Sequence, residues 1–211
     1  MLMRQKKNYM LKIITPHKHD FYTSVDESGK HQYEEKINFS KYMDSYNEEE
    51  EYRYDVLRNI LRLETKLNAI FSYEFIHHYN INTVEDLHVI LERFKTNLPL
   101  EPSNIDEKII SGKKSTLNNL ILNSGKNEEI YITLKSISFS QLINLIDSTD
   151  EDFKLLLINR IMENGLQIFS ETEMVQYIPK LRQIVMIRNA CCHNMRLKLL
   201  TVYDMKNTRE Y

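Results

Sequence analysis

Residues 54–75 read YDVLRNILRLETKLNAIFSYEF, and their apolar side chains recur at steps of three and four. This spacing places the apolar side chains along one face of an α-helix. The face consists of Val56, Leu57, Ile60, Leu63, Leu67, Ile70, Phe71 and Phe75. An acidic run at 48–51 precedes it, and negative charge is favoured at a helix N-terminus. The stretch therefore predicts one long helix from near Asn47 to near Tyr79.

Helical spacing continues through most of the remaining chain, which has only four Gly and four Pro among its 211 residues. Thr83 and Asp86 have the spacing of a capping box, and the helix that follows them is expected to end before Pro99. Further helices are predicted at 139–146 and 150–164.

The part of the chain between these helices has weaker signals. Residues 100–125 contain Gly and Pro together with several Asn and Ser, which predicts irregular structure with one short helix near 115–123. Residues 129–138 alternate loosely between polar and apolar side chains and are interpreted as extended. The expected fold class is all-α, an antiparallel helical bundle with irregular insertions and little sheet.

The N-terminal part of the chain differs in composition from the rest. Residues 1–40 are rich in His, Lys and Tyr, and the first 19 residues carry no carboxylate. We interpret residues 1–40 as a basic N-terminal arm or small appended segment, and residues 41–211 as one helical domain. A chain with 42% hydrophobic residues at this length can bury a core.

Several function classes are excluded by what the chain lacks. No apolar run approaches the ~20 residues that a membrane helix needs, and Lys12 interrupts the only apolar stretch near the N-terminus. We therefore expect no membrane contact and a cytoplasmic location. Cys191 and Cys192 are sequence neighbours without Cys or His at metal-finger spacing, so neither a disulfide framework nor a metal site is expected.

The formal net charge of −2 argues, taken alone, against a nucleic-acid partner. The charges are unevenly distributed, however, because residues 179–198 contain basic residues and no carboxylate. The basic residues of this segment are Lys180, Arg182, Arg188, Arg196 and Lys198. A binding site depends on such local charge more than on the total.

The same segment contains the pattern with the most chemical information. Residues 178–200 read IPKLRQIVMIRNACCHNMRLKLL. If one helix runs through them, Asn189, His193 and Arg196 lie along one face, whereas Arg188 lies about 140° around the helix from His193. The Arg and His would meet only if the long Arg side chain swung across or a second copy supplied the missing group. This geometry favours a symmetric dimer.

An Arg followed a few residues later by a His is not a specific pattern, because about one such match is expected by chance in a chain of this composition. An Asn directly after the Arg makes the match rarer. From the residues alone, a surface Arg and a partly buried His without a chemical role remain an alternative.

A family resemblance adds to this pattern. Residues 187–197, IRNACCHNMRL, resemble the RN-x3-H-x2-R-L signature of bacterial abortive-infection proteins of the AbiD/AbiF type, which belong to the HEPN superfamily and its Arg-x4-6-His ribonucleases. Residues 54–75 are similar to the first-helix pattern of that family, and residues 132–146 look like the segment before its last helices. The resemblance covers about residues 35–200 and implies a HEPN-like helical bundle.

The resemblance implies an antiphage toxin that acts as a metal-independent endoribonuclease without a cofactor. In this interpretation His193 transfers protons, and Arg188 positions the phosphate and stabilises its transition-state charge. Asn189 would orient the imidazole or the phosphate, Arg196 is a candidate second phosphate contact, and Glu64 is a candidate partner that holds one of the two Arg side chains.

The implied partners are an RNA substrate, a second copy of the chain in a homodimer, and an RNA or protein antitoxin. The alternative function is a catalytically silent module with the same scaffold that binds RNA or an antitoxin.

Overall fold

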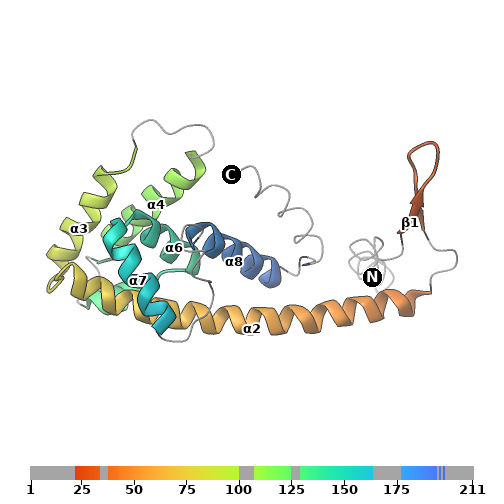
Figure 1. Cartoon of the computed structure of the whole chain (residues 1–211), viewed down its shortest axis with the longest axis horizontal. Coiled ribbons are helices and arrows are strands. Elements are labelled where there is room, and N and C mark those ends of the chain that lie inside the picture. Colours follow the sequence, from red (N-terminus) through yellow and green to blue (C-terminus); the bar gives the residue numbers. More distant parts are fainter. Residues whose placement is uncertain are drawn as a thin grey trace, which may run out of the picture. The chain divides into compact units, whose positions relative to one another are not determined.

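The computed structural model describes residues 22–33, 38–99, 107–124, 129–163, 177–193, 195 and 197. The predicted all-α class is confirmed, because helices account for nearly all of the regular structure in these residues (Figure 1). The elements are β1 (Tyr22–Val25), β2 (His31–Tyr33), α2 (Phe39–His78), α3 (Val84–Thr96), α4 (Glu107–Ser124), α5 (Ile130–Lys135), α6 (Phe139–Ser148), α7 (Glu151–Glu163) and α8 (Tyr177–Cys192).

The chain divides into two compact units. The first unit combines Met1–Asn59 with Ile187–Tyr211, and the second unit is Ile60–Met186. Helices α2 and α8 each contribute residues to both units. The predicted boundary between an arm at residues 1–40 and a domain at 41–211 stays a prediction.

Strands β1 and β2 form a small antiparallel hairpin in the first unit. The Asp26 carboxylate accepts hydrogen bonds from the backbone N–H groups of Ser28 and Lys30 at 3.0 and 2.9 Å, which closes the turn. Gly29 has φ of 80°, a left-handed conformation that glycine adopts without steric cost.

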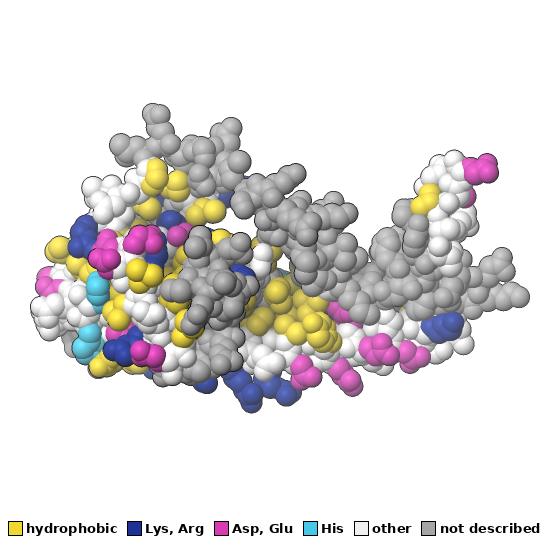
Figure 2. Space-filling model, in the orientation of Figure 1, with side chains coloured by type: hydrophobic (Ala, Val, Ile, Leu, Met, Phe, Trp, Pro, Cys, Tyr) yellow, Lys and Arg dark blue, Asp and Glu magenta, His cyan; other side chains and the backbone are white. Residues whose placement is uncertain are grey.

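Helix α2 begins at Phe39, so the predicted start near Asn47 is wrong. The Asn38 side chain accepts hydrogen bonds from the N–H and the hydroxyl of Ser40, both at 3.0 Å, and these bonds fit the start of a helix. The acidic run at 48–51 therefore lies inside the helix, where Glu49 is buried and its neighbours are more exposed. Figure 2 shows acidic side chains along the first part of α2.

Aromatic side chains from three helices form the centre of the second unit. Phe71 and Phe75 of α2 stack with ring centroids 5.0 Å apart, and Phe153 of α7 packs edge-on against Phe75 at 5.8 Å. Phe94 of α3 lies 6.2 Å from Phe75. Buried aliphatic residues complete this core, among them Leu67, Leu87, Leu91, Leu117, Leu134, Leu142 and Leu157. Each such side chain contributes roughly 1.5–3 kcal/mol on burial.

The predicted capping box of α3 is confirmed. Thr83 accepts a hydrogen bond from the backbone N–H of Asp86 at 3.1 Å, and the Asp86 carboxylate accepts one from the N–H of Thr83 at 2.8 Å. The helix ends at Thr96, before Pro99 as predicted. Local side-chain chemistry was sufficient to locate this element.

Helix α4 contradicts the predicted irregular structure at 107–114. Gly112 lies inside this helix, where a methyl group would come within 3.3 Å of the Asn144 amide nitrogen on α6. The missing side chain therefore lets two helices approach closely, and their packing outweighs the roughly 1 kcal/mol that Gly costs in a helix interior.

Helix α5 contradicts the predicted extended structure at 129–138. Thr133 and Ser136 donate backbone hydrogen bonds four residues back, at 3.2 and 3.0 Å, and Leu134 is buried. The Lys135 ammonium also lies 4.5 Å from the centroid of the Tyr131 ring, a contact that helical i,i+4 spacing permits.

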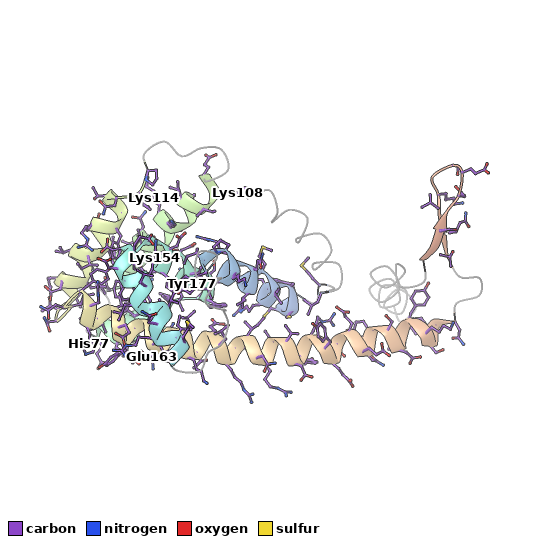
Figure 3. The ribbon with its side chains drawn as sticks, in the orientation of Figure 1. His77, Lys108, Lys114, Lys154, Glu163 and Tyr177 are labelled. Carbon is purple, nitrogen blue, oxygen red and sulfur yellow. The ribbon has the colours of Figure 1, made fainter. Side chains whose placement is uncertain are left out.

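A polar network anchors the first part of α8 within the second unit. Arg182 bonds Asp147 at 2.7 Å and Asn144 at 3.0 Å, and Lys113 pairs with Asp147 at 2.9 Å. Burial raises the pKa of Asp147, but the bonds to Lys113 and Arg182 outweigh burial and lower it below 3.8. Tyr177, labelled in Figure 3, is buried at the beginning of this helix.

Candidate functional site

Helix α8 carries the Arg and Asn of the motif and ends at Cys192. His193 is the first residue after the helix. Its N–H donates to the Asn189 carbonyl at 3.0 Å, and the Met195 N–H donates to the Ala190 carbonyl at 2.9 Å. These bonds close the helix end, as is common where helices stop.

The alignment of Asn189, His193 and Arg196 is expected for one helix through residues 178–200, and α8 ends before the last two of these residues. Asn189 and His193 are joined by the backbone bond across the last turn. Arg196 lies outside the described residues. The side-chain direction of His193 therefore depends on how the segment after the helix is held.

The end of α8 rests on an apolar base in the first unit. Ala190, Cys191 and Leu197 are buried at 3%, 5% and 4% exposure. Val56 and Leu57 of α2, together with Ile187, pack against them. The last turn of α8 and Leu197 thus belong to one apolar cluster with residues of α2. Buried members of this cluster come both before and after His193 in the sequence.

Glu49 of α2 binds the segment that follows His193. Its Oε1 accepts a hydrogen bond from the Leu197 backbone N–H at 2.7 Å, and the residue is only 3% exposed. A charge-assisted bond at a buried site is stronger than an ordinary one. Hydrogen bonds therefore hold the backbone around His193. Two of them close the helix end, and the third joins Leu197 to Glu49.

Arg53 lies one turn further along α2 and is 4% exposed. Its guanidinium lies 5.8 Å from the centroid of the Tyr46 ring. Among the described residues, Nη2 of Arg53 and Oε2 of Glu49 have no hydrogen-bond partner. A buried polar atom without a hydrogen-bond partner costs free energy.

The pKa of the Cys191 thiol depends on burial and on the charged groups near the last turn of α8. Burial raises the pKa of its thiol and Cys192 adds to the increase, whereas Arg53 lowers it and Glu49 raises it. The thiol is therefore protonated near neutral pH and is a poor nucleophile. The two buried charges of α2 thus act directly on the helix that carries the motif.

Glu49 and Arg53 are functional candidates that the sequence interpretation missed. Their spacing in the sequence indicates burial, because positions 49, 53, 56 and 60 follow one another at steps of four, three and four. They therefore occupy positions of the apolar face, where a charged side chain needs a reason. A helix start also accounts for an acidic run, so the charge of Glu49 alone does not mark it as a buried residue.

The motif residues differ in their exposure. Arg188 is partly buried and donates from Nη1 to the Asn189 side-chain oxygen at 3.4 Å, whereas Asn189 and His193 are exposed. This is the reverse of the alternative with a surface Arg and a partly buried His. The imidazole of His193 is accessible from solvent.

Glu64, the predicted partner of an Arg, belongs to the second unit and is partly buried there. Its proposed role toward Arg188 or Arg196 stays a prediction. Within the described residues, no group of three or more His, Cys, Asp or Glu side chains is arranged to hold a metal ion. The described helices also include none that is long and apolar enough to cross a membrane.

A family model with the description Abi-like protein matches residues 6–198, which include both α2 and the whole motif. The chain belongs to the Abi-like protein family. Membership of this family links the chain to abortive infection, a form of antiviral defence. Comparisons with curated proteins and with solved structures found no match.

Proposed function

We propose that this Abi-like protein is a metal-independent endoribonuclease of the HEPN type that acts as an abortive-infection toxin. The observation that carries the proposal is the exposed His193, which is one helical turn from Asn189 and next in space to the anchored end of α8. Family membership supports the biological role, and the residue types of the motif support the chemistry.

The reaction needs no metal if side chains move the protons. His193 accepts the proton of a ribose 2′-OH, and the oxygen attacks the adjacent phosphorus. The bond from phosphorus to the 5′-oxygen then breaks, and a protonated imidazole supplies the proton that this oxygen takes up. The products are a 2′,3′-cyclic phosphate and a 5′-hydroxyl end.

Arg188 supplies the charge that this transition state requires. A guanidinium stays protonated and can donate two parallel hydrogen bonds to phosphate oxygens. Arg188 lies in the last turn but one of α8 and contacts the Asn189 side-chain oxygen at 3.4 Å. A homodimer would contribute a second His193, so that one imidazole acts as base and the other as acid.

The decisive test is cleavage of single-stranded RNA by the purified protein in EDTA. We expect cutting with cyclic phosphate ends, and a loss of at least 100-fold in Arg188→Ala and in His193→Ala. Arg58→Ala is the control, because Arg58 is exposed in the first unit and its pair with Asp55 is long, at 3.4 Å. Undiminished cutting by both motif variants would refute the assignment. Salt-dependent RNA binding without cutting would favour the silent RNA-binding module.

A further inference from the structure

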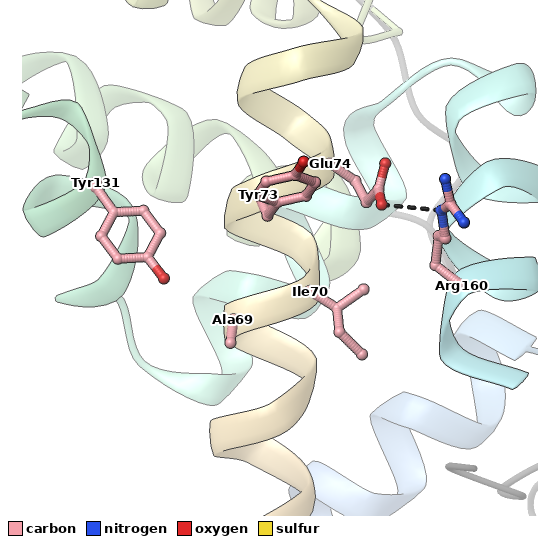
Figure 4. Close-up of a pocket in the computed structure, with 6 residues that line it drawn as sticks. All are labelled: Ala69, Ile70, Tyr73, Glu74, Tyr131 and Arg160. Carbon is pink, nitrogen blue, oxygen red and sulfur yellow. Dashed lines mark ion pairs between the residues drawn. The ribbon is translucent and has the colours of Figure 1, made fainter. Parts of the chain in front are cut away.

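A groove of about 570 Å³ opens on the second unit, at a place that the proposed chemistry does not use (Figure 4). It is lined by Ala69, Ile70, Tyr73, Glu74, Tyr131 and Arg160. These residues come from α2, α5 and α7, and all of them lie within the second unit. The volume is in the range of small-ligand sites. We propose that the groove binds an unpaired base of single-stranded RNA.

Two tyrosine rings, those of Tyr73 and Tyr131, line the groove. Tyr73 is 57% exposed and Tyr131 is 41% exposed, although large aromatic side chains are usually buried. In Figure 4 the two rings come from different helices, with the short Ala69 side chain below them. The Tyr73 ring packs on the His77 ring with centroids 4.0 Å apart, so a base would stack on its other face. Stacking on an aromatic ring tolerates any base.

The carboxylate of the groove is paired with a guanidinium. Glu74 is only 12% exposed at its side chain and pairs with Nε of Arg160 at 3.0 Å. Arg160 also pairs with the exposed Glu163 at 2.8 Å, outside the lining. The groove wall thus offers an acceptor and donors to the edge of a base without an isolated negative charge.

Cations extend from the groove along the exposed face of α2. Lys66 and Arg62 precede Tyr73 by seven and eleven residues, which puts all three within about 20° of one line along the helix. Lys66 and Arg62 are exposed, and neither forms an ion pair with the described residues. Lys135 lies over the Tyr131 ring at 4.5 Å. Basic residues next to aromatic rings are the arrangement with which proteins follow single strands.

The choice of RNA over a peptide follows from this charge pattern. The apolar part of the lining consists of Ala69, Ile70 and the two tyrosine rings, and flat rings suit a planar base. A phosphate backbone requires the row of cations beside the rings. The inference rests on the proposed function only in taking RNA as the ligand, because the groove and the motif segment are separate features.

The absence of Trp from the chain allows a direct test of stacking. In a His193→Ala background, Tyr131→Trp and Tyr73→Trp each introduce a single indole. We expect a short oligouridylate to quench this fluorescence, and a blunt RNA duplex, whose bases stay stacked, to leave it unchanged. Tyr52→Trp is the matched control, because Tyr52 is also 57% exposed on α2 but lies outside the groove.

Affinity measurements with fluorescein-labelled oligouridylate complete the test. Tyr73→Ala and Tyr131→Ala should each weaken binding about five- to 150-fold, whereas the Phe variants should bind within about twofold of the parent. Ala69→Leu fills the groove while both rings remain, so it should weaken binding even if a Tyr→Ala variant fails to fold. Lys66→Ala should reduce the salt dependence of binding by about one phosphate contact.

Unchanged affinity in Ala69→Leu, or equal quenching at Tyr52→Trp and in the groove, would overturn the proposal. The outcome is independent of the proposed chemistry, because all of these variants lack His193. If RNA binds in the groove but the wild type does not cut it, the endonuclease proposal fails and this one stands. If the wild type cuts RNA and the groove variants bind normally, only this proposal fails.

Discussion

At the scale of single residues, Glu49 connects α2 to the backbone that follows His193. The bond from the Leu197 N–H to Oε1 is 2.7 Å long and almost completely shielded from solvent. A buried N–H that loses its acceptor costs about 1–3 kcal/mol. Glu49 therefore holds the backbone that follows His193, and in the proposed reaction it would act as a positioning residue through the placement of the imidazole.

We expect Glu49→Ala to lower the free energy of unfolding by about 1–3 kcal/mol and to reduce RNA cleavage about tenfold, because the segment after His193 loses its anchor. Glu49→Gln retains an acceptor oxygen and should keep most of the wild-type stability and most of the wild-type cleavage rate. Urea denaturation and initial cleavage rates measure the two effects. Glu48→Ala, in the exposed part of the same run, should change stability by less than about 0.5 kcal/mol. Equal behaviour of Glu48→Ala and Glu49→Ala would contradict the anchoring role.

At the scale of elements, helices α4, α6 and α8 are joined by polar side chains inside the second unit. Asn144 donates to the Thr116 hydroxyl at 3.2 Å and accepts from Arg182 at 3.0 Å. Asp147 accepts from Arg182 and from Lys113. These hydrogen bonds hold the Asn144 side chain in place, so a new side chain on α4 that meets it should lower the free energy of unfolding.

Gly112→Ala should lower the free energy of unfolding by about 1 kcal/mol. At a free helical site this change stabilises by about the same amount, but here the new methyl group meets Asn144 at 3.3 Å. Thermal or urea denaturation gives the sign directly. Ser115→Ala, at an exposed position of the same helix, should be neutral or slightly stabilising. A stabilised Gly112→Ala variant would mean that the side chain of Asn144 moves away freely.

Asp147→Asn should destabilise the protein by about 1–2 kcal/mol at pH 7, because Arg182 and Lys113 lose their common carboxylate. The bonds depress the pKa of Asp147 in the folded state below 3.8, so its contribution is fully present above that pH and is lost as the pH falls further. Urea midpoints of wild type and variant should therefore differ at pH 7, and the difference should shrink as the pH falls through the depressed pKa of Asp147. A difference that is independent of pH would exclude this ion pair as the cause.

At the scale of the whole molecule, the motif segment and the aromatic core belong to different compact units. The first unit contains α8 from Ile187 onward with its apolar base, and the second contains the stacked Phe residues of α2. Substitutions of exposed motif residues should therefore leave the aromatic core folded. Any change in toxicity to cells should then come from the loss of the proposed RNA cleavage and not from unfolding.

Induced expression of the wild-type chain should arrest bacterial growth, and His193→Ala should not, although both accumulate to the same level. The proposed toxin acts through RNA cleavage, and His193 is exposed and outside the core. Growth curves with immunoblots measure the effect, and Arg58→Ala should remain as toxic as the wild type. Arrest by His193→Ala at equal abundance would separate toxicity from this site.

Much of the fold could be predicted because local patterns determine it. The apolar steps from Val56 to Phe75 predicted α2, the Thr83–Asp86 pair predicted the start of α3, and the stretch from Phe139 to Ile146 predicted α6. The motif around Arg188 was also visible, because residue type and spacing are properties of the chain itself. A helical face and a side-chain cap each involve residues only a few positions apart.

Other features depend on residues that are distant in the sequence, and only the tertiary structure decided them. Gly112 is accommodated in α4 because Asn144 lies beside it, and Glu49 is buried because the N–H of Leu197 meets it 148 positions further along the chain. Periodicity identifies which side chains share a face, but not what packs against that face. For the same reason the sequence alone determined the apolar face of α2, the helices α3 and α6, and the motif, whereas α4, α5 and the apolar base under the end of α8 depend on packing between distant residues.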